Sequence, residues 1–123
     1  MSTSTITRTP STAPRSAEQI AAVLENPGFG RVFTDNMVTI RWTEAEGWHD
    51  AQLVPYAPIP MDPATNFIHY GQAIFEGLKA YRHADGSIRT FRPIQNAERF
   101  ANSARRLAMA EQPEAGRVVS APK

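Results

Sequence analysis

The chain has 123 residues, of which 41% are hydrophobic and 20% are charged, and its net charge is +1. This length suits one domain with a modest core, and the composition argues against a disordered chain, a membrane-spanning chain or a strongly basic nucleic-acid binder. The absence of cysteine excludes disulfides, zinc thiolate sites and thiol nucleophiles, and no metal site is predicted.

Residues 1–16 are predicted to form a disordered polar tail. The first 17 residues hold nine serines and threonines, two arginines and no acidic residue. This composition occurs in organelle transit peptides, but Pro10 and Pro14 oppose the amphipathic helix that such a peptide needs. No apolar run marks the chain for secretion, so we expect a cytoplasmic protein.

The ordered part is expected to begin with a short helix and then strands. Ser16 is a good N-cap for this helix, and Asn26-Pro27-Gly28 would end it. The segment 32–42 is rich in β-branched and aromatic residues and predicts strands interrupted at Asp35-Asn36. The segment 44–50 is predicted to be a turn before a second extended piece, "AQLVPY".

A loop, a hairpin and a helix are predicted next. Four prolines between residues 55 and 63 predict an irregular surface loop. Two apolar-rich runs, 73–82 and 88–91, flank Asp85-Gly86, which favours a type I′ turn with both central residues at positive φ.

After Pro93, a good first helical residue, apolar residues recur at helical spacing. This apolar stripe consists of Ala97, Phe100, Ala101, Ala104, Leu107 and Ala108. The pattern is lost from Ala110, so residues 110–123 are predicted to form an irregular tail outside the fold.

Several residues could serve a ligand, but each also has a plainer interpretation. Tyr70 and Phe75 lie beside glycines that let the backbone approach a ligand, yet the residues alone favour core aromatics. Arg99 could clamp a phosphate, although most helix arginines are solvated. Lys79 could form a Schiff base, although strand lysines usually lie at exposed edges, and His69 could be a general base or a structural residue.

Four stretches in this order resemble the N-terminal region of branched-chain amino-acid aminotransferases, which belong to the fold-type IV enzymes that use pyridoxal phosphate. They are "GFGRVFTDNMVTIRW", "GWHDAQLVPYAPI", "HYGQAIFEGLKAYR" and "FRPIQNAERFANSARRLAM". The resemblance covers residues 28–109 and implies an α/β (α+β) class-IV small domain over residues 17–109. In this domain a sheet that includes the hairpin would pack with the helices.

The resemblance also assigns roles by position. Arg99 matches the family arginine that binds the phosphate of the cofactor, which suits a bidentate guanidinium. Tyr70 matches a tyrosine that lines the pocket for the branched side chain across a homodimer interface. Phe75 and Phe29 match apolar pocket walls, as expected for leucine, isoleucine and valine as substrates.

No catalytic residue is assigned to this chain. Its two lysines are Lys79, which does not match the family's Schiff-base lysine, and Lys123, in the irregular tail. The catalytic lysine, the acidic partner of the ring nitrogen and the second phosphate loop belong to the family's C-terminal domain. The chain is therefore expected to be an incomplete enzyme, inactive alone.

Two departures from the family pattern accompany the resemblance. The family usually has histidine where Asn36 stands, and it does not continue with "AEQPEAGRVVSAPK" after Met109. A break at Ala110 favours a shifted reading frame or a truncated gene product as a hypothesis.

Two alternatives remain open beside amino transfer from branched-chain amino acids to 2-oxoglutarate. One is a D-amino-acid aminotransferase or an aminodeoxychorismate lyase of the same fold. The other is a non-catalytic small domain that binds a protein partner through exposed apolar surface. Nucleic-acid binding is not expected, because the arginines are scattered among twelve acidic residues.

Overall fold

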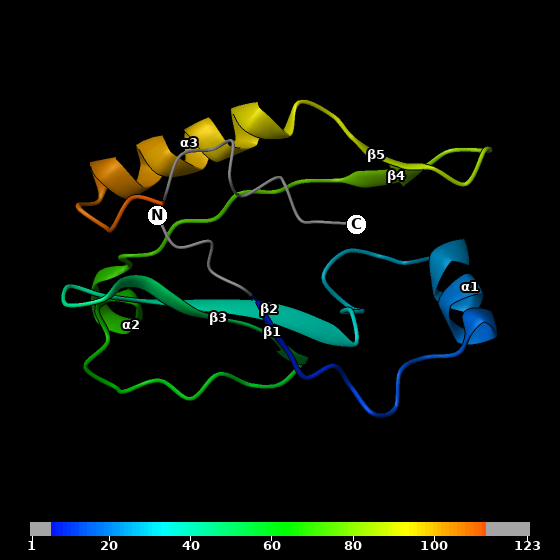
Figure 1. The fold of residues 1–123 in the computed structure, drawn as a ribbon, viewed down its shortest axis with the longest axis horizontal. Helices are drawn as coiled ribbons and strands as arrows, with labels where there is room; N and C mark the ends of the chain where they lie inside the picture. Colours follow the sequence, from blue (N-terminus) through cyan, green and yellow to red (C-terminus); the bar gives the residue numbers. More distant parts are fainter. Residues whose placement is uncertain (1–5, 113–123) are drawn as a thin grey trace. The chain divides into compact units, whose positions relative to one another are not determined.

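The computed structural model describes residues 6–112, and the chain divides at Pro60 into two compact units. Residues 1–5 and 113–123 of the two predicted tails, with Lys123, lie outside the described residues. Both units combine short strands with helices (Figure 1). The mixed α/β class expected from the sequence is therefore confirmed.

The first unit contains a three-stranded sheet of order β1-β3-β2. Its strands are β1 (Thr7–Arg8), β2 (Asn36–Thr43) and β3 (Gly47–Pro55). The central strand, β3, runs antiparallel to β2 and parallel to β1. A turn at residues 44–46 joins β2 to β3, and Gly47 beside it has a φ of 67°, which glycine adopts at little cost.

A β-bulge interrupts the pairing of β2 with β3. Thr39 pairs with Gln52 and Arg41 pairs with His49, so β3 carries one residue more than β2 between these pairs. Asp50, in this interval, has a φ of 52°. Such a bulge increases the local twist of the two strands.

Residues 7–16, which belong to the predicted polar tail, include the strand β1 in the structure. Besides the strand β1, Ser11 and Arg15 of this segment donate hydrogen bonds to residues that precede and begin β2. The backbone N–H of Ser11 donates to Asn36 Oδ1 at 2.7 Å, and Arg15 Nη1 donates to Asp35 Oδ1 at 2.8 Å. Asn36, noted as a departure from the family pattern, thus holds the N-terminal segment in this structure.

We expect Asp35→Ala to release this segment from the sheet. The change removes one of the two acceptors for the Arg15 guanidinium, the other being the Phe33 carbonyl, and the acceptor for the Arg15 backbone N–H. Trypsin should then cleave after Arg8 and Arg15 about fivefold faster, the effect of losing about one net hydrogen bond. Mass spectrometry of timed digests measures this, with Glu44→Ala in the β2–β3 turn as control. Equal cleavage rates in the two variants would contradict the anchoring role of Asp35.

The second unit contains the predicted hairpin, but with a different turn. Its strands are β4 (Ala80–Arg82) and β5 (Ile88–Thr90), which form a separate two-stranded sheet. The Gly86 N–H donates to the His83 carbonyl, and only Gly86 of the Asp85-Gly86 pair has a positive φ, 79°. The expected type I′ turn is therefore wrong: the hairpin has the longer loop in which a β-turn is followed by a left-handed glycine.

Two helices follow the sequence signals closely. The first is α1 (Ala17–Glu25), which begins with a capping box: Ser16 Oγ accepts from the Gln19 N–H, and Gln19 Oε1 accepts from the Ser16 N–H. The second is α3 (Pro93–Arg106), with Pro93 in its first turn as predicted. Ala104 of the predicted stripe is buried, whereas Leu107 and Ala108 lie beyond the helix and are exposed.

Other boundaries were predicted incorrectly. Residues 32–35 form no strand, and residues 47–50, assigned to a turn, begin β3 instead. A five-residue helix, α2 (Asn66–Tyr70), was not predicted, and it ends at Gly71 with a φ of 62°. Tyr70 therefore belongs to a helix end and not to the end of a strand.

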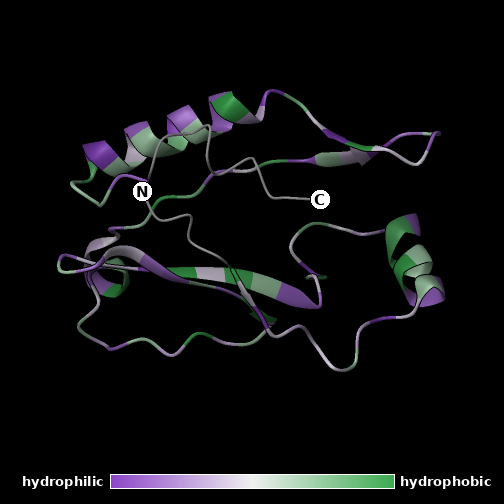
Figure 2. Cartoon of the chain, in the orientation of Figure 1, coloured by the Kyte–Doolittle hydropathy of each residue, from purple (hydrophilic) through white to green (hydrophobic). Residues whose placement is uncertain are grey.

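Burial is slight in the described part of the chain. Only Ala51 and Ala104 are buried among residues 6–112, and no large side chain there is fully buried. Hydrophobic residues cover much of α1 and recur along β2 and β3 (Figure 2). Many of them are exposed, and exposed apolar surface of this extent is typical of surfaces that other parts of a protein cover.

Candidate functional site

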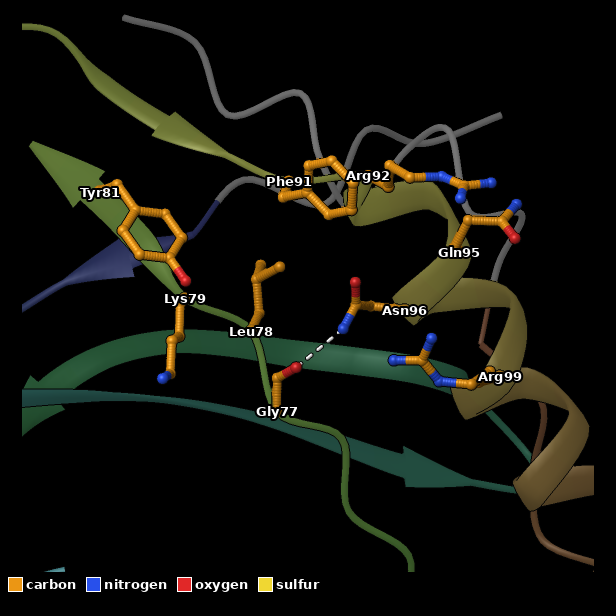
Figure 3. A pocket seen from close by; sticks show the side chains of 9 residues that line it. All are labelled: Gly77, Leu78, Lys79, Tyr81, Phe91, Arg92, Gln95, Asn96 and Arg99. Atoms are coloured by element: carbon orange, nitrogen blue, oxygen red, sulfur yellow. Dashed lines mark hydrogen bonds between the residues drawn. The ribbon is translucent and has the colours of Figure 1, made fainter. Parts of the chain in front are cut away.

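A hollow of about 420 Å³ lies in the second unit, beside β4 and the first turns of α3 (Figure 3). Three of its nine lining residues are cationic and none is acidic. The lining residues are Gly77, Leu78, Lys79, Tyr81, Phe91, Arg92, Gln95, Asn96 and Arg99. A volume of this size suits a small ligand.

The chemistry of the lining suits an anionic ligand with an aromatic ring. Lys79, Arg92 and Arg99 supply positive charge, and the Gln95 amide, which donates one hydrogen bond to Glu98, has a second N–H that can donate to a ligand. Tyr81 and Phe91 add aromatic surface to the lining of the same hollow (Figure 3). A phosphate ester of an aromatic compound would match both kinds of lining.

The helix α3 brings the polar lining together. Arg92 precedes the first helical residue and has a φ of 47°. Gln95, Asn96 and Arg99 follow it by three, four and seven residues, the spacing that places side chains on one face of a helix. This face is distinct from the apolar stripe and presents donors to the hollow.

Arg99 makes a bidentate ion pair with Glu76. Its Nε donates to Glu76 Oε2 at 3.0 Å, and its Nη2 donates to Glu76 Oε1 at 2.7 Å. Asn96 Nδ2 also donates to Glu76 Oε1, at 2.9 Å, and to the Gly77 carbonyl, at 2.8 Å. These contacts fix the irregular segment before β4 against α3.

The pKa of Glu76 lies below its ordinary value of 4.5, chiefly because Arg99 and also Asn96 donate hydrogen bonds to its carboxylate. A carboxylate whose pKa is lowered by folding stabilises the fold above its ordinary pKa, and this contribution disappears as the pH falls through the lowered pKa. Between about pH 6 and pH 3, the wild-type chain should therefore lose more unfolding free energy than Glu76→Gln. Urea titrations at each pH measure this, and parallel pH profiles would contradict it.

Of the predicted site residues in the second unit, one lines the hollow. Arg99 lines the hollow, whereas Tyr70 and Phe75 of the same unit do not, and they are 82% and 91% exposed. Phe29 belongs to the first unit and is 99% exposed. The interpretation of Tyr70 and Phe75 as core aromatics is therefore wrong for this structure.

Several residues around Arg99 were not predicted to belong to a site. Glu76, Asn96, Gln95 and Arg92 were not assigned to a site. Helical spacing from Arg99 could have indicated the three on or beside α3, but Glu76 lies 23 residues away in an irregular segment. Lys79 was considered as an edge lysine, and the structure places it in the lining of the hollow just before β4.

Neither a membrane span nor a metal site is found in the part of the chain that the structure describes. Within residues 6–112, no helix is long and apolar enough to cross a membrane. No group of three histidine or acidic side chains in that range could hold a metal ion.

Comparison with known proteins identifies close relatives. The chain is 63% identical, over 113 residues, to a probable branched-chain-amino-acid aminotransferase of Streptomyces coelicolor, and this match covers 92% of the chain and 31% of the relative. It is 61% identical, over 93 residues, to a branched-chain-amino-acid aminotransferase of Mycolicibacterium smegmatis, which covers 76% of the chain and 25% of the relative. A branched-chain-amino-acid transaminase 1 of Bacillus subtilis is 50% identical over 82 residues, 67% of the chain and 23% of the relative. No family model matches the chain.

These matches bear on the C-terminal segment. The Streptomyces match spans 113 of the 123 residues, so ten residues of the chain lie outside it. The segment 110–123 has 14 residues, so part of this segment belongs to the match. The break expected at Ala110 stays a prediction. The chain spans about a quarter to a third of the length of these relatives, and over this N-terminal part it belongs to the branched-chain-amino-acid aminotransferase family.

Proposed function

We propose that this chain provides the phosphate-binding and substrate-pocket part of a branched-chain amino-acid aminotransferase. The complete enzyme would transfer the amino group of leucine, isoleucine or valine to 2-oxoglutarate. The observation that carries this proposal is the 63% identity, over 113 residues, to a relative named as such an enzyme. The names of the relatives favour this substrate class over D-amino acids or aminodeoxychorismate.

Pyridoxal phosphate is the proposed cofactor, and when bound it supplies the electron sink for transamination. The hollow supports this proposal because Arg99, Arg92 and Lys79 can neutralise a phosphate. Tyr81 and Phe91 offer surface for an aromatic ring. Arg99 is the residue that we propose to bind the phosphate directly, and the Schiff-base lysine is assigned to the part of the enzyme outside this chain.

Tyr70, Phe75 and Phe29 are the proposed apolar walls of the substrate pocket. All three are more than 80% exposed in this chain. Large aromatic side chains stabilise a protein when other surfaces cover them, so a substrate, a second domain or a second subunit would complete these walls. A homodimer in the cytoplasm is part of the same proposal.

A complementation experiment tests the proposed function. The joined protein for this test is the present chain followed by the part of the Streptomyces coelicolor relative that lies beyond the match. It is expressed in a bacterial strain that lacks its own branched-chain aminotransferases and requires leucine, isoleucine and valine. We expect growth without these amino acids, whereas the relative's part alone should not support growth. A folded joined protein that fails to restore growth would contradict the proposal.

A further inference from the structure

Glu76 binds a defined edge of the Arg99 guanidinium. A guanidinium offers a side edge, formed by Nε and one Nη, and an end edge, formed by the two Nη atoms. Glu76 accepts hydrogen bonds from Nε and Nη2, so it occupies the side edge. The end edge, with Nη1, makes no hydrogen bond to the residues that the structure describes and remains available to a ligand in the hollow.

The carboxylate of Glu76 is itself held from several sides. Its Oε1 accepts from Asn96 Nδ2 at 2.9 Å and from the Gly77 N–H at 3.1 Å, besides the bond from Arg99. The Glu76 side chain is 20% exposed, whereas that of Arg99 is 61% exposed. The acid is therefore the fixed partner of the pair, and the arginine is the partner that reaches solvent and the hollow.

A long, exposed arginine side chain otherwise samples many rotamers, and a ligand must then bear the cost of ordering it. A bidentate carboxylate reduces this cost because it restricts both the position and the plane of the guanidinium. The remaining end edge also has the geometry that two oxygens of one phosphate can accept.

We propose that Glu76 is a positioning residue that orients Arg99, so that the end edge of its guanidinium binds a phosphate ester in the hollow. This inference rests on the proposed function, because the phosphate is that of the cofactor. Glu76 does not touch the phosphate itself; a carboxylate there would repel it. Asn96 supports the arrangement by fixing Glu76 and Gly77 to α3.

Two cofactor forms separate this role from a merely structural one. Pyridoxal phosphate and pyridoxal share the ring but only the first carries a phosphate. In the joined protein, Glu76→Gln should raise the dissociation constant of pyridoxal phosphate about tenfold over the wild-type value. The dissociation constant of pyridoxal should stay within about twofold of its wild-type value. Fluorescence titrations give both dissociation constants, and their ratio is the readout. A loss of folded structure would weaken both ligands alike.

A matched control lies on the same helix. Arg105 pairs with Glu111 through Nε at 3.0 Å and Nη2 at 2.7 Å, nearly the same geometry as Arg99 with Glu76, but Arg105 does not line the hollow. Glu111→Gln should therefore leave the ratio unchanged. If Glu76→Gln does not fold, Asn96→Ala replaces it, with an expected change in the ratio of about threefold.

The outcomes distinguish this inference from the proposed function. A wild-type joined protein that does not bind pyridoxal phosphate overturns both. A wild type that binds it, together with an unchanged ratio in Glu76→Gln or in its substitute, overturns only the positioning role. Tighter binding of pyridoxal phosphate by Glu76→Gln also overturns it, because Glu76 would then compete with the phosphate for Arg99.

Discussion

Arg99→Lys is expected to weaken the binding of pyridoxal phosphate to the joined protein by about tenfold to 100-fold. A lysine offers one point charge and cannot form two parallel hydrogen bonds to a phosphate. It also cannot bind Glu76 in the bidentate manner that fixes Arg99. The dissociation constant of the cofactor, from equilibrium titration, measures the effect.

Arg106→Lys is the matched control for this change. Arg106 is exposed at the end of α3 and does not line the hollow. Its replacement should leave cofactor binding within about twofold, since surface substitutions have small effects. Equal dissociation constants for Arg99→Lys and the wild type would show that the phosphate binds elsewhere.

Ala104→Asp is expected to lower the free energy of unfolding of the joined protein by about 3 kcal/mol or more. Ala104 is 1% exposed, the lowest value among the buried residues of the described chain. A carboxylate at this position would lose its hydration. Aspartate is also larger than alanine, so its side chain would have to displace the neighbouring groups. Urea unfolding followed by circular dichroism measures the change.

Ala108→Asp introduces the same side chain at an exposed position just beyond α3. Ala108 has a φ of 52°, a conformation that aspartate tolerates better than most residues. We expect a change in unfolding free energy within about 0.5 kcal/mol. If Ala104→Asp were as well tolerated as Ala108→Asp, Ala104 would not be part of a packed interior.

The parts of the fold that follow local signals were predictable. Pro93 and the apolar spacing after it predicted α3, and Ser16 predicted the start of α1 because both signals act within one or two helical turns. The Asp85-Gly86 pair predicted a hairpin but not its loop, since the same two residues occur in loops of two and of three residues.

The parts that depend on distant partners were not predictable. The two residues of β1 lie in a segment rich in serine, threonine and proline, and they are ordered by hydrogen bonds to β3 more than 40 residues away. The helix α2 has only five residues, too few to show a helical period. The Glu76–Arg99 pair joins an irregular segment to a helix, and no local pattern encodes it.

The candidate site was predictable in part for the same reason. The family motif identified Arg99, and the structure places Arg99 in a hollow with cations and amides that local patterns had not connected. The motif also named Tyr70, Phe75 and Phe29, and their role as pocket walls stays a prediction. Their high exposure in this chain is consistent with walls that are completed by groups outside it.

The central claim is that this chain supplies part of an enzyme that transaminates branched-chain amino acids. The most direct measurement is the rate of amino transfer to 2-oxoglutarate by the purified joined protein, with leucine and with D-alanine as alternative donors. The account predicts that kcat/KM for leucine exceeds that for D-alanine by about 100-fold or more, since an apolar pocket rewards each added methylene. A preference for D-alanine, or no transfer by a folded protein that holds its cofactor, would contradict it.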